Sequence, residues 1–250
     1  MAKPYLSVVI PAYNEEKRIP TTLLDIDKHL SAAEYSYEII VVVAPSTDRT
    51  VEVVQRHCEI IKNLRMVTPE KGYGKGHAVK VGMIEARGQH RVFTDADNST
   101  TIDHFDRMVP YFKEGYGVVI CSRAMKGSKL TPAQPLYRQI PGKIGNLIIQ
   151  VLVLPGLWDT QCGFKGFTED AARDIFNRVT INRWGFDVEA LALARKFSYR
   201  IKEIPVTWIN DLESKVTAGG FISTLTDVFK IRWNLWFDRY EDKYDGRYKV

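Results

Sequence analysis

Two aspartates stand one residue apart after a short apolar run, in the stretch RVFTDADNST at residues 91–100. Asp95 and Asp97 repel each other and lose solvation when partly buried, so a chain that keeps both at a strand end is expected to supply a cation. A hard divalent ion is usually held by one or two carboxylates while it bridges phosphate oxygens. The pair therefore indicates a Mg²⁺ or Mn²⁺ site at a diphosphate, although a solvated turn explains D-x-D alone equally well.

A glycine- and lysine-rich segment, KGYGKG at residues 71–76, is a second phosphate-binding candidate. Bare backbone amides before a helix, together with Lys71 and Lys75, can approach a phosphate group. The spacing matches neither a Walker A loop nor G-x-G-x-x-G, so a flexible, solvated turn explains the segment at least as well when it is taken alone.

Strand-like and helical patterns, which are expected to position these residues, alternate from residue 6 to about residue 122. Short β-branched runs alternate with helical periodicity, which is typical of parallel βαβ units and predicts an α/β fold with a mostly parallel sheet flanked by helices. Strands are predicted at 6–11, 37–43, 64–68, 91–95 and 117–122. Ligands of such sheets bind beyond the carboxyl ends of the strands, where Asp95 and Asp97 fall.

The pattern changes after Arg123, to a polar loop with three prolines and then an apolar segment that ends at Trp158. We therefore predict a first half of about 1–122, a second half of about 123–217, and a C-terminal amphipathic helix with a tail at 218–250. One face of this helix is expected to carry Ile222, Leu225, Phe229, Trp233, Trp236 and Tyr240.

Composition places the chain among ordinary globular proteins, with 250 residues, 45% hydrophobic and 26% charged. The formal charge of +5 suits an anionic substrate or lipid surface and is too small to argue for nucleic acid. Three cysteines without paired spacing predict neither a disulfide framework nor a zinc site and favour a reducing, cytosolic compartment. We expect no signal peptide, and the apolar stretch 144–158 falls short of the roughly 20 residues of a membrane span.

Six motifs occur in the order found in inverting family 2 glycosyltransferases. They are VVIPAYNEE at 8–16, KGYGKGHAVKVGM at 71–83, TDADNST at 94–100, CSRA at 121–124, DTQCGFKGFT at 159–168 and RWGFDVE at 183–189. The chain most resembles dolichyl-phosphate β-glucosyltransferases and related polyprenyl-phosphate glycosyltransferases, over about residues 5–217. Each motif alone is weak, and their ordered occurrence makes the resemblance specific.

The resemblance implies a GT-A fold, a nucleotide-sugar donor, and a polyprenyl or dolichyl phosphate acceptor. Residues 1–122 would then bind the nucleotide and residues 123–217 would face the acceptor. UDP-glucose is the favoured donor and GDP-mannose the nearest alternative. Two other classes stay open: a catalytically silent nucleotide-binding scaffold, and transfer to a hydroxyl group, which would require a general base.

The matching motifs imply that six residues bind the donor: Pro11, Tyr13, Glu15, Lys75, Asp95 and Asp97. The first three would line the nucleotide pocket, Lys75 would meet the diphosphate, and the two aspartates would hold Mg²⁺ or Mn²⁺. The family commonly has an Asp-Asp-Gly-Ser type sequence after the second strand, whereas this chain has Val43, Ala44 and Pro45. Asp48 either replaces a lost contact to the nucleotide or caps the next helix.

The acceptor side needs cations more than a base, because a phosphate monoester is already largely ionised at neutral pH. Arg123 and Arg138 are the candidates for holding that phosphate, with a plain surface arginine as the alternative reading, favoured for Arg138. By resemblance, Gln161 and Lys165 would shape the acceptor side. Asp187 would line the site, as a weakly catalytic residue at most or as a helix cap.

A polyprenyl phosphate keeps its tail in the bilayer, so the protein is expected to contact a membrane surface. Residues 144–158 and the aromatic helix 222–240 are the predicted contact segments, with packing in the core or against another subunit as the alternative. We expect peripheral association with the cytoplasmic face of a membrane. A homo-oligomer or a membrane-protein partner is also compatible with these faces.

Overall fold

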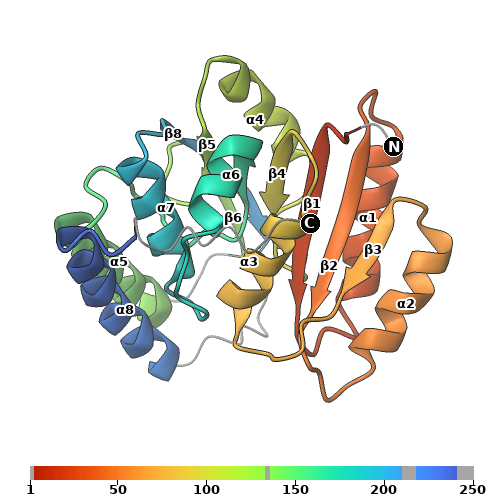
Figure 1. Cartoon of the computed structure of the whole chain (residues 1–250), viewed down its shortest axis with the longest axis horizontal. Helices are drawn as coiled ribbons and strands as arrows, with labels where there is room; N and C mark the ends of the chain where they lie inside the picture. Colours follow the sequence, from red (N-terminus) through yellow and green to blue (C-terminus); the bar gives the residue numbers. More distant parts are fainter. Residues whose placement is uncertain (1–2, 133–135, 210–217, 241–250) are drawn as a thin grey trace.

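A seven-stranded sheet in the order β3-β2-β1-β4-β7-β5-β8 forms the centre of the computed structural model (Figure 1). The structure describes residues 3–132, 136–209 and 218–240, and the side chains of 136–141 and 218–222 are not described. The strands of this sheet are β1 Leu6–Ala12, β2 Tyr37–Val43, β3 Leu64–Val67, β4 His90–Phe93, β5 Val118–Ser122, β7 Lys165–Thr168 and β8 Ile201–Pro205. All five predicted strands are present, with ends that differ by at most two residues.

The sheet is mostly parallel, as predicted. Strand β7 alone is antiparallel to its neighbours, β4 and β5. It comes from the second half of the chain and lies between two strands of the first half, so both halves share one sheet. A separate two-stranded sheet pairs β6 (Lys129–Thr131) with β9 (Thr207–Ile209).

Helices cover both faces of the sheet. They are α1 Ile19–Ser31, α2 Thr50–Ile60, α3 Lys75–Glu85, α4 His104–Lys113, α5 Leu136–Leu152, α6 Glu169–Phe176, α7 Phe186–Lys196 and α8 Ala218–Trp236. One core cluster packs α1, α2 and α4 against the sheet, and the other packs α3, α6 and α7. Because both faces are covered, β2 is apolar from Ile39 to Val43 without alternation.

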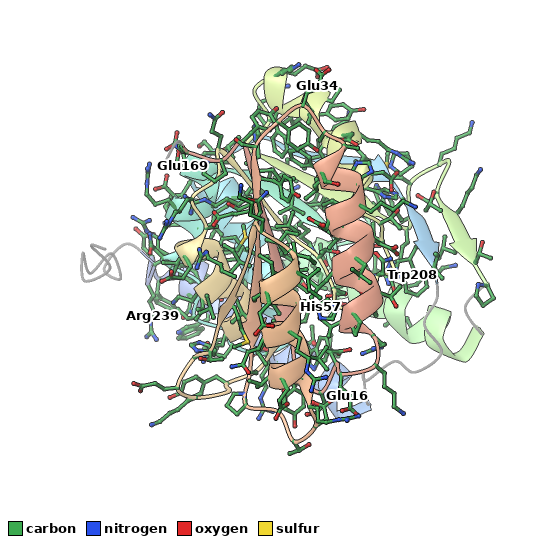
Figure 2. All side chains as sticks on the ribbon, turned by 90° about the vertical axis from the view of Figure 1, so that its right-hand side faces the viewer. Glu16, Glu34, His57, Glu169, Trp208 and Arg239 are labelled. Atoms are coloured by element: carbon green, nitrogen blue, oxygen red, sulfur yellow. The ribbon has the colours of Figure 1, made fainter. Side chains whose placement is uncertain are left out.

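Parallel strands bring their carboxyl ends to one edge of the sheet. Figure 2 shows this polarity, with Glu16, which follows β1, and Glu34, which precedes β2, at opposite ends of the molecule. The residues after β1, β2, β4 and β5 therefore gather at the edge where Glu16 lies, as the strand pattern predicted.

Helices α5 and α8 pack against each other at the side of the molecule away from α2 (Figure 1). Of α8, Val228 and Ile231 are buried, whereas Phe229, Trp233 and Trp236 are 61%, 52% and 74% exposed. None of the helices in the described part of the chain combines the length and apolar character that a membrane span requires.

The predicted apolar face of the C-terminal helix is wrong at its end. The helix stops at Trp236 instead of continuing to Tyr240, and the next residues turn back on α7. Tyr240 is therefore fully buried, and its hydroxyl donates a hydrogen bond of 2.9 Å to Glu189. The side chain of Ile222, also predicted on this face, lies outside the described residues.

Candidate active site

The carboxyl edge of the sheet brings the predicted site residues to one region. Asp95 follows β4 by two residues, and Arg123 follows β5 directly. Lys75 is the first residue of α3, and its Nζ lies 2.5 Å from Asp95 Oδ1. Lys75 and Asp95, from two separate motifs, therefore meet in space. Burial opposes the charge of Arg123, but Asp159 and, more weakly, Asp95 raise its pKa.

The two aspartates have different surroundings. The Asp95 carboxylate packs so closely on the backbone of Gly163 that a Cβ at this glycine would collide with it. Asp97 accepts a 3.0 Å hydrogen bond from the amide of Ser99. Burial, followed by the charge of Asp95, raises the pKa of Asp97.

The residues at this position suit a divalent cation that binds together with a substrate. Among the described residues there is no group of three or more His, Cys, Asp or Glu side chains that could hold a metal by itself. Two hard carboxylate oxygen donors instead match a metal whose remaining ligands are diphosphate oxygens and water. The close approach of the Lys75 ammonium shows that Asp95 accepts a cation at this point.

The surroundings of Lys75 stabilise its charged form, which suits the binding of an anion. Burial opposes its charge, but Asp95 and then Asp187 favour it, and the pKa of Lys75 is raised. Its Nζ also lies 5.5 Å from the centroid of the Trp184 ring. Gly74, with φ of 121°, and Gly76 allow this helix start to pack on residues 181–183, where a Cβ at either glycine would collide with the backbone.

On the expected nucleotide side, Tyr13 is 52% exposed and Pro11 is half-buried. The Glu15 carboxylate is held by Arg18 through two contacts of 2.7 Å. Asp48 accepts hydrogen bonds from the amides of Glu16 and Thr50, at 3.1 and 3.0 Å. Burial favours a higher pKa for Asp48, but the hydrogen bonds from these amides and from the Thr50 hydroxyl lower it. The Asp48 carboxylate therefore acts as a cap at the start of α2.

On the expected acceptor side, Arg123 is fixed by Asp159. Nε and Nη2 of Arg123 lie 2.7 and 2.9 Å from the two carboxylate oxygens, and the backbone amide of Arg123 donates to Asp159 at 2.9 Å. The Arg123 guanidinium also lies 5.5 Å from the centroid of the Trp208 ring. Gln161 is exposed nearby in sequence, and the Arg138 side chain lies outside the described residues.

Lys165 differs from the expectation that it would shape the acceptor side directly. It is 0% exposed, and its Nζ donates to Asp187 at 2.6 Å and to the carbonyl of Cys162 at 2.5 Å. Its place in β7, between β4 and β5, turns it into the core. Lys165 therefore contacts the site from the core, through its ion pair with Asp187.

Asp187 and Glu189 both have structural partners. Burial raises the pKa of Asp187, against the opposing charges of Lys165 and then Lys75. Glu189 accepts hydrogen bonds from the amides of Thr180 and Ile181, both at 2.8 Å. Glu189 therefore fastens the loop before α7 and takes no part in the site.

Sequence reasoning did not find four residues that shape the site: Asp159, Trp184, Glu203 and Trp208. Asp159 and Trp184 lie inside quoted motifs, so their position was a usable signal. Glu203 and Trp208 lie in no motif, and only the pairing of β8 with β5 and of β9 with β6 brings them close.

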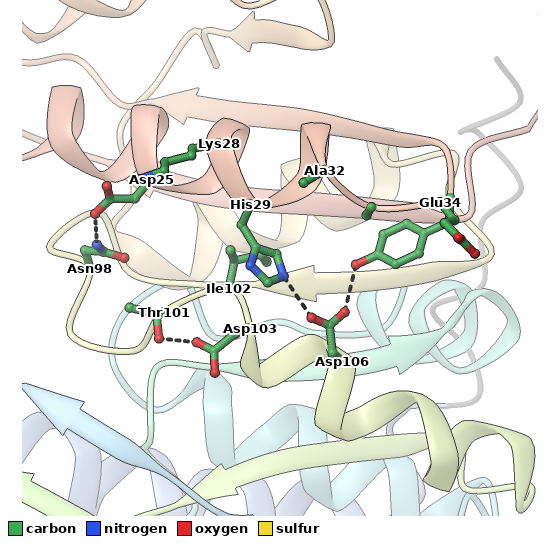
Figure 3. A pocket seen from close by; sticks show the side chains of 12 residues that line it. Asp25, Lys28, His29, Ala32, Glu34, Asn98, Thr101, Ile102, Asp103 and Asp106 are labelled. Atoms are coloured by element: carbon green, nitrogen blue, oxygen red, sulfur yellow. Dashed lines mark hydrogen bonds and ion pairs between the residues drawn. The ribbon is translucent and has the colours of Figure 1, made fainter.

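A separate pocket of about 770 Å³ lies between α1, α4 and the loop after Asp97 (Figure 3). Its carboxylates bind neighbouring side chains: Asp106 lies 2.8 Å from His29 Nε2, and Asp25 accepts from Asn98 at 2.8 Å. These contacts fasten α1 to α4, and we assign the pocket no ligand.

Solved structures with this arrangement of elements are glycosyltransferases. Glucosyl-3-phosphoglycerate synthase from Mycobacterium tuberculosis, in complex with Mn²⁺, UDP-glucose and phosphoglyceric acid, aligns with a TM-score of 0.68 and 17% identity, over 92% of this chain and 80% of that chain. S. aureus TarS 1-349, in complex with UDP-GlcNAc, aligns with a TM-score of 0.58 and 18% identity, over 90% and 66%. The expected GT-A fold is thereby confirmed.

Two relatives similar over most of their length share the name dolichyl-phosphate beta-glucosyltransferase. The Dictyostelium discoideum protein is 36% identical over 242 residues, covering 92% of this chain and 74% of the relative. The Homo sapiens protein is 33% identical over 224 residues, covering 84% and 69%. A model of the family described as Glycosyl transferase family 2 matches residues 7–176, more than half of the chain. The chain therefore belongs to glycosyl transferase family 2.

Proposed function

We propose that this protein transfers glucose from UDP-glucose to a dolichyl or other polyprenyl phosphate, with inversion at the anomeric carbon. The names of its relatives support the acceptor and the sugar. One observation carries the proposal: the edge of the sheet presents Lys75 beside two aspartates, and Arg123 nearby, while the candidate base Asp187 is tied to Lys165.

The site separates the charges of the two substrates. Lys75 is placed to stabilise the departing diphosphate, and Arg123 is placed to hold the attacking phosphate. An oxygen of the acceptor phosphate forms a bond to the anomeric carbon as the bond from this carbon to the diphosphate breaks, and UDP leaves with the electron pair. Mg²⁺ or Mn²⁺ at Asp95 and Asp97 would supply charge neutralisation for that leaving group.

The pairing of Asp187 with Lys165 agrees with a phosphate acceptor. A sugar or protein hydroxyl would have to lose a proton, whereas a phosphate monoester with a second pKa near 6 is already ionised. The Asp187 carboxylate is 4% exposed and bonded to Lys165 at 2.6 Å, which leaves it poorly placed to take a proton from a substrate.

The donor base is the least constrained part of the proposal. At the end of β2, Val43 and Ala44 are buried and offer no carboxylate, and the carboxylate of Asp48 already accepts the amides of Glu16 and Thr50. A missing carboxylate removes hydrogen bonds that would distinguish one base from another. GDP-mannose is therefore the second donor that we consider.

Eight exposed apolar residues of α5, α8 and the turns that follow them form the proposed membrane contact, which we call the apolar face. They are Ile144, Leu147, Val151, Trp158, Phe229, Trp233, Trp236 and Phe237. Exposed Lys143, Lys230, Arg232 and Arg239 lie on or next to the same helices. Aromatic side chains at headgroup depth with cations beside them suit an anionic bilayer surface, where each cation contributes about 1 kcal/mol.

The proposed location is the cytoplasmic face of a membrane, with peripheral attachment. Cys58, Cys121 and Cys162 are free thiols, which suits a reducing compartment. The apolar face would bring Arg123 to the acceptor phosphate at the bilayer surface.

The test is a transfer assay with purified protein, a short polyprenyl phosphate, Mg²⁺ or Mn²⁺, and UDP-glucose and GDP-mannose in parallel. We expect product from UDP-glucose and a loss of product when the metal is chelated. Product from GDP-mannose alone would replace the donor assignment. Donor binding without product from either donor, measured by calorimetry, would favour a catalytically silent nucleotide-binding protein and contradict the proposal.

A further inference from the structure

The contact between Arg123 and Asp159 orients the guanidinium. The pair uses Nε and Nη2, and no described residue accepts a hydrogen bond from Nη1. Asp159 is only 8% exposed, whereas the Arg123 side chain is 28% exposed. The buried carboxylate therefore holds one edge of the guanidinium fork, and the other edge has no partner among the described residues.

Asp159 is itself fixed by Glu203, which lies in β8 opposite Ile120 of β5. The carboxylate of Glu203 is 9% exposed and accepts hydrogen bonds from the backbone amides of Trp158 and Asp159, at 3.0 and 3.1 Å. Although burial opposes the charge of Asp159, Arg123 lowers the pKa of this carboxyl group. Hydrogen bonds thus connect Glu203, in a strand of the sheet, through Asp159 to the guanidinium of Arg123.

The same turn joins this support to the apolar face. Trp158 is 60% exposed, and its carbonyl accepts a 2.7 Å hydrogen bond from Asn146 of α5. An exposed tryptophan of the proposed membrane contact and the residue that holds Arg123 are therefore consecutive in the chain. This placement favours the lipid-linked substrate as the ligand of Arg123, because the donor diphosphate is expected at Lys75 and the two aspartates.

We propose that Asp159, held by Glu203, is a positioning residue that fixes Arg123 for the phosphate of the lipid acceptor. This inference rests on the proposed function. A guanidinium that is already oriented loses little conformational freedom when the phosphate binds, so the contact is stronger than that of a free arginine. The negative charge of Asp159 alone would weaken the binding of an anion, so positioning and plain electrostatics predict opposite effects on its removal.

The first experiment replaces Asp159 by Asn and measures transfer with increasing concentrations of a short polyprenyl phosphate. We expect the KM for the acceptor to rise about tenfold, equivalent to about 1.4 kcal/mol, with calorimetric binding of UDP-glucose unchanged. Asp170→Asn is the matched control, because Asp170 forms an exposed 2.7 Å pair with Arg173 on α6. An unchanged or lowered KM for the acceptor in Asp159→Asn would overturn the inference.

A double-variant cycle separates positioning from a general structural role. Arg123→Ala should raise the same KM, and adding Asp159→Asn to it should cause no further rise, because Asp159 acts through Arg123. An additional rise would contradict the inference. If Asp159→Asn does not fold, Glu203→Gln takes its place, with the same expected rise in KM for the acceptor and the same control.

The outcomes for the inference and for the proposed function differ. If the wild type transfers glucose and the Asp159 variant keeps its affinity for the acceptor, the function stands and the inference fails. If the wild type transfers no sugar from any donor, the function fails, and the inference fails with it.

Discussion

Asp97 is the residue of the D-x-D pair whose charge is the more costly to keep. Burial raises the pKa of Asp97, and its carboxylate accepts a hydrogen bond from the Ser99 amide, so a bound cation would supply a compensating charge. Asp95, in contrast, already has Lys75 beside it. We therefore expect metal binding to depend on Asp97 at least as strongly as on Asp95.

Replacing Asp97 by Ala should abolish metal-dependent binding of UDP-glucose, because one of two protein ligands is lost. Calorimetric titration with and without Mn²⁺ measures the effect, and we expect a loss of roughly tenfold or more in affinity that appears only with metal present. Asp170→Ala, on the exposed surface of α6, is the control. Equal metal-dependent binding by Asp97→Ala and the wild type would refute the assignment.

Asp187 is expected to contribute to stability and little to proton transfer. Asp187→Asn leaves the buried Lys165 ammonium without its counter-charge, which should lower the free energy of unfolding by about 3–5 kcal/mol. Turnover with a phosphate acceptor, assayed well below the unfolding midpoint, should fall by less than about tenfold, since no base is needed.

The control for Asp187 is the double variant Lys165→Met/Asp187→Leu, which replaces the ion pair by apolar side chains and should recover much of the lost stability. Urea denaturation measures both variants. Complete loss of turnover in Asp187→Asn, with donor binding intact, would instead identify Asp187 as a general base and point to a hydroxyl acceptor.

At the scale of elements, His90 connects β4 to α4 and to the start of the chain. Its ring stacks on Phe112 at 4.6 Å and meets the edge of Tyr5 at 4.8 Å. Burial lowers the pKa of His90 to about 4, and its Nδ1 is buried without a hydrogen-bond partner in the described structure. The folded protein therefore favours the neutral imidazole.

This shift predicts a pH dependence of stability. In the unfolded chain His90 takes up a proton near pH 6.5, whereas in the folded protein it does so near pH 4, so stability is full above pH 6.5 and declines as the pH falls towards 4. His90→Phe should lack this part of the decline in urea denaturation between pH 7.5 and 4.5. Identical curves for His90→Phe and the wild type would contradict the shift.

Helices α5 and α8 carry the apolar face, and membrane binding belongs to this scale. Replacing Trp233 and Trp236 by Ser should reduce sedimentation with anionic phospholipid vesicles at least about tenfold, because each large apolar side chain contributes roughly 1.5–3 kcal/mol when buried. Ile60→Ser is the control, since Ile60 is 73% exposed on α2, at another side of the molecule. Unchanged binding by the double tryptophan variant would exclude α8 as a membrane contact.

At the scale of the whole molecule, β7 makes the two halves of the chain interdependent. It lies between β4 and β5, so neither half can complete the sheet alone. We therefore do not expect the boundaries predicted at about residues 122 and 217 to mark separate folding units.

Unfolding in urea should accordingly be one transition for both halves. All five tryptophans lie between residues 158 and 236, so their fluorescence reports the second half and the C-terminal helix, while thiol labelling of Cys58 reports the first half. Coincident midpoints are expected for a single cooperative unit. Two separated midpoints would show that the halves unfold independently.

The sequence by itself determined the class of fold and the place of the site. Alternating β-branched runs and helical periodicity specify parallel strands, and such strands carry their ligands at one edge, so the motifs that follow them had to converge. Asp95 and Asp97 were predicted at this edge in this way, whereas Lys75 was proposed from its motif and Arg123 from the charge of the acceptor. The departure at Val43 and Ala44 was also visible in the sequence.

Only the tertiary structure decided which side chains pair at that edge. Arg123 and Asp159 are joined because β7 and β8 flank β5, and local periodicity does not encode the order of strands. The burial of Lys165 follows from the same order. Periodicity placed Phe229, Trp233 and Tyr240 on one face, whereas α8 ends at Trp236, and Tyr240 is buried with its hydroxyl bonded to Glu189 of α7 while the other two stay exposed.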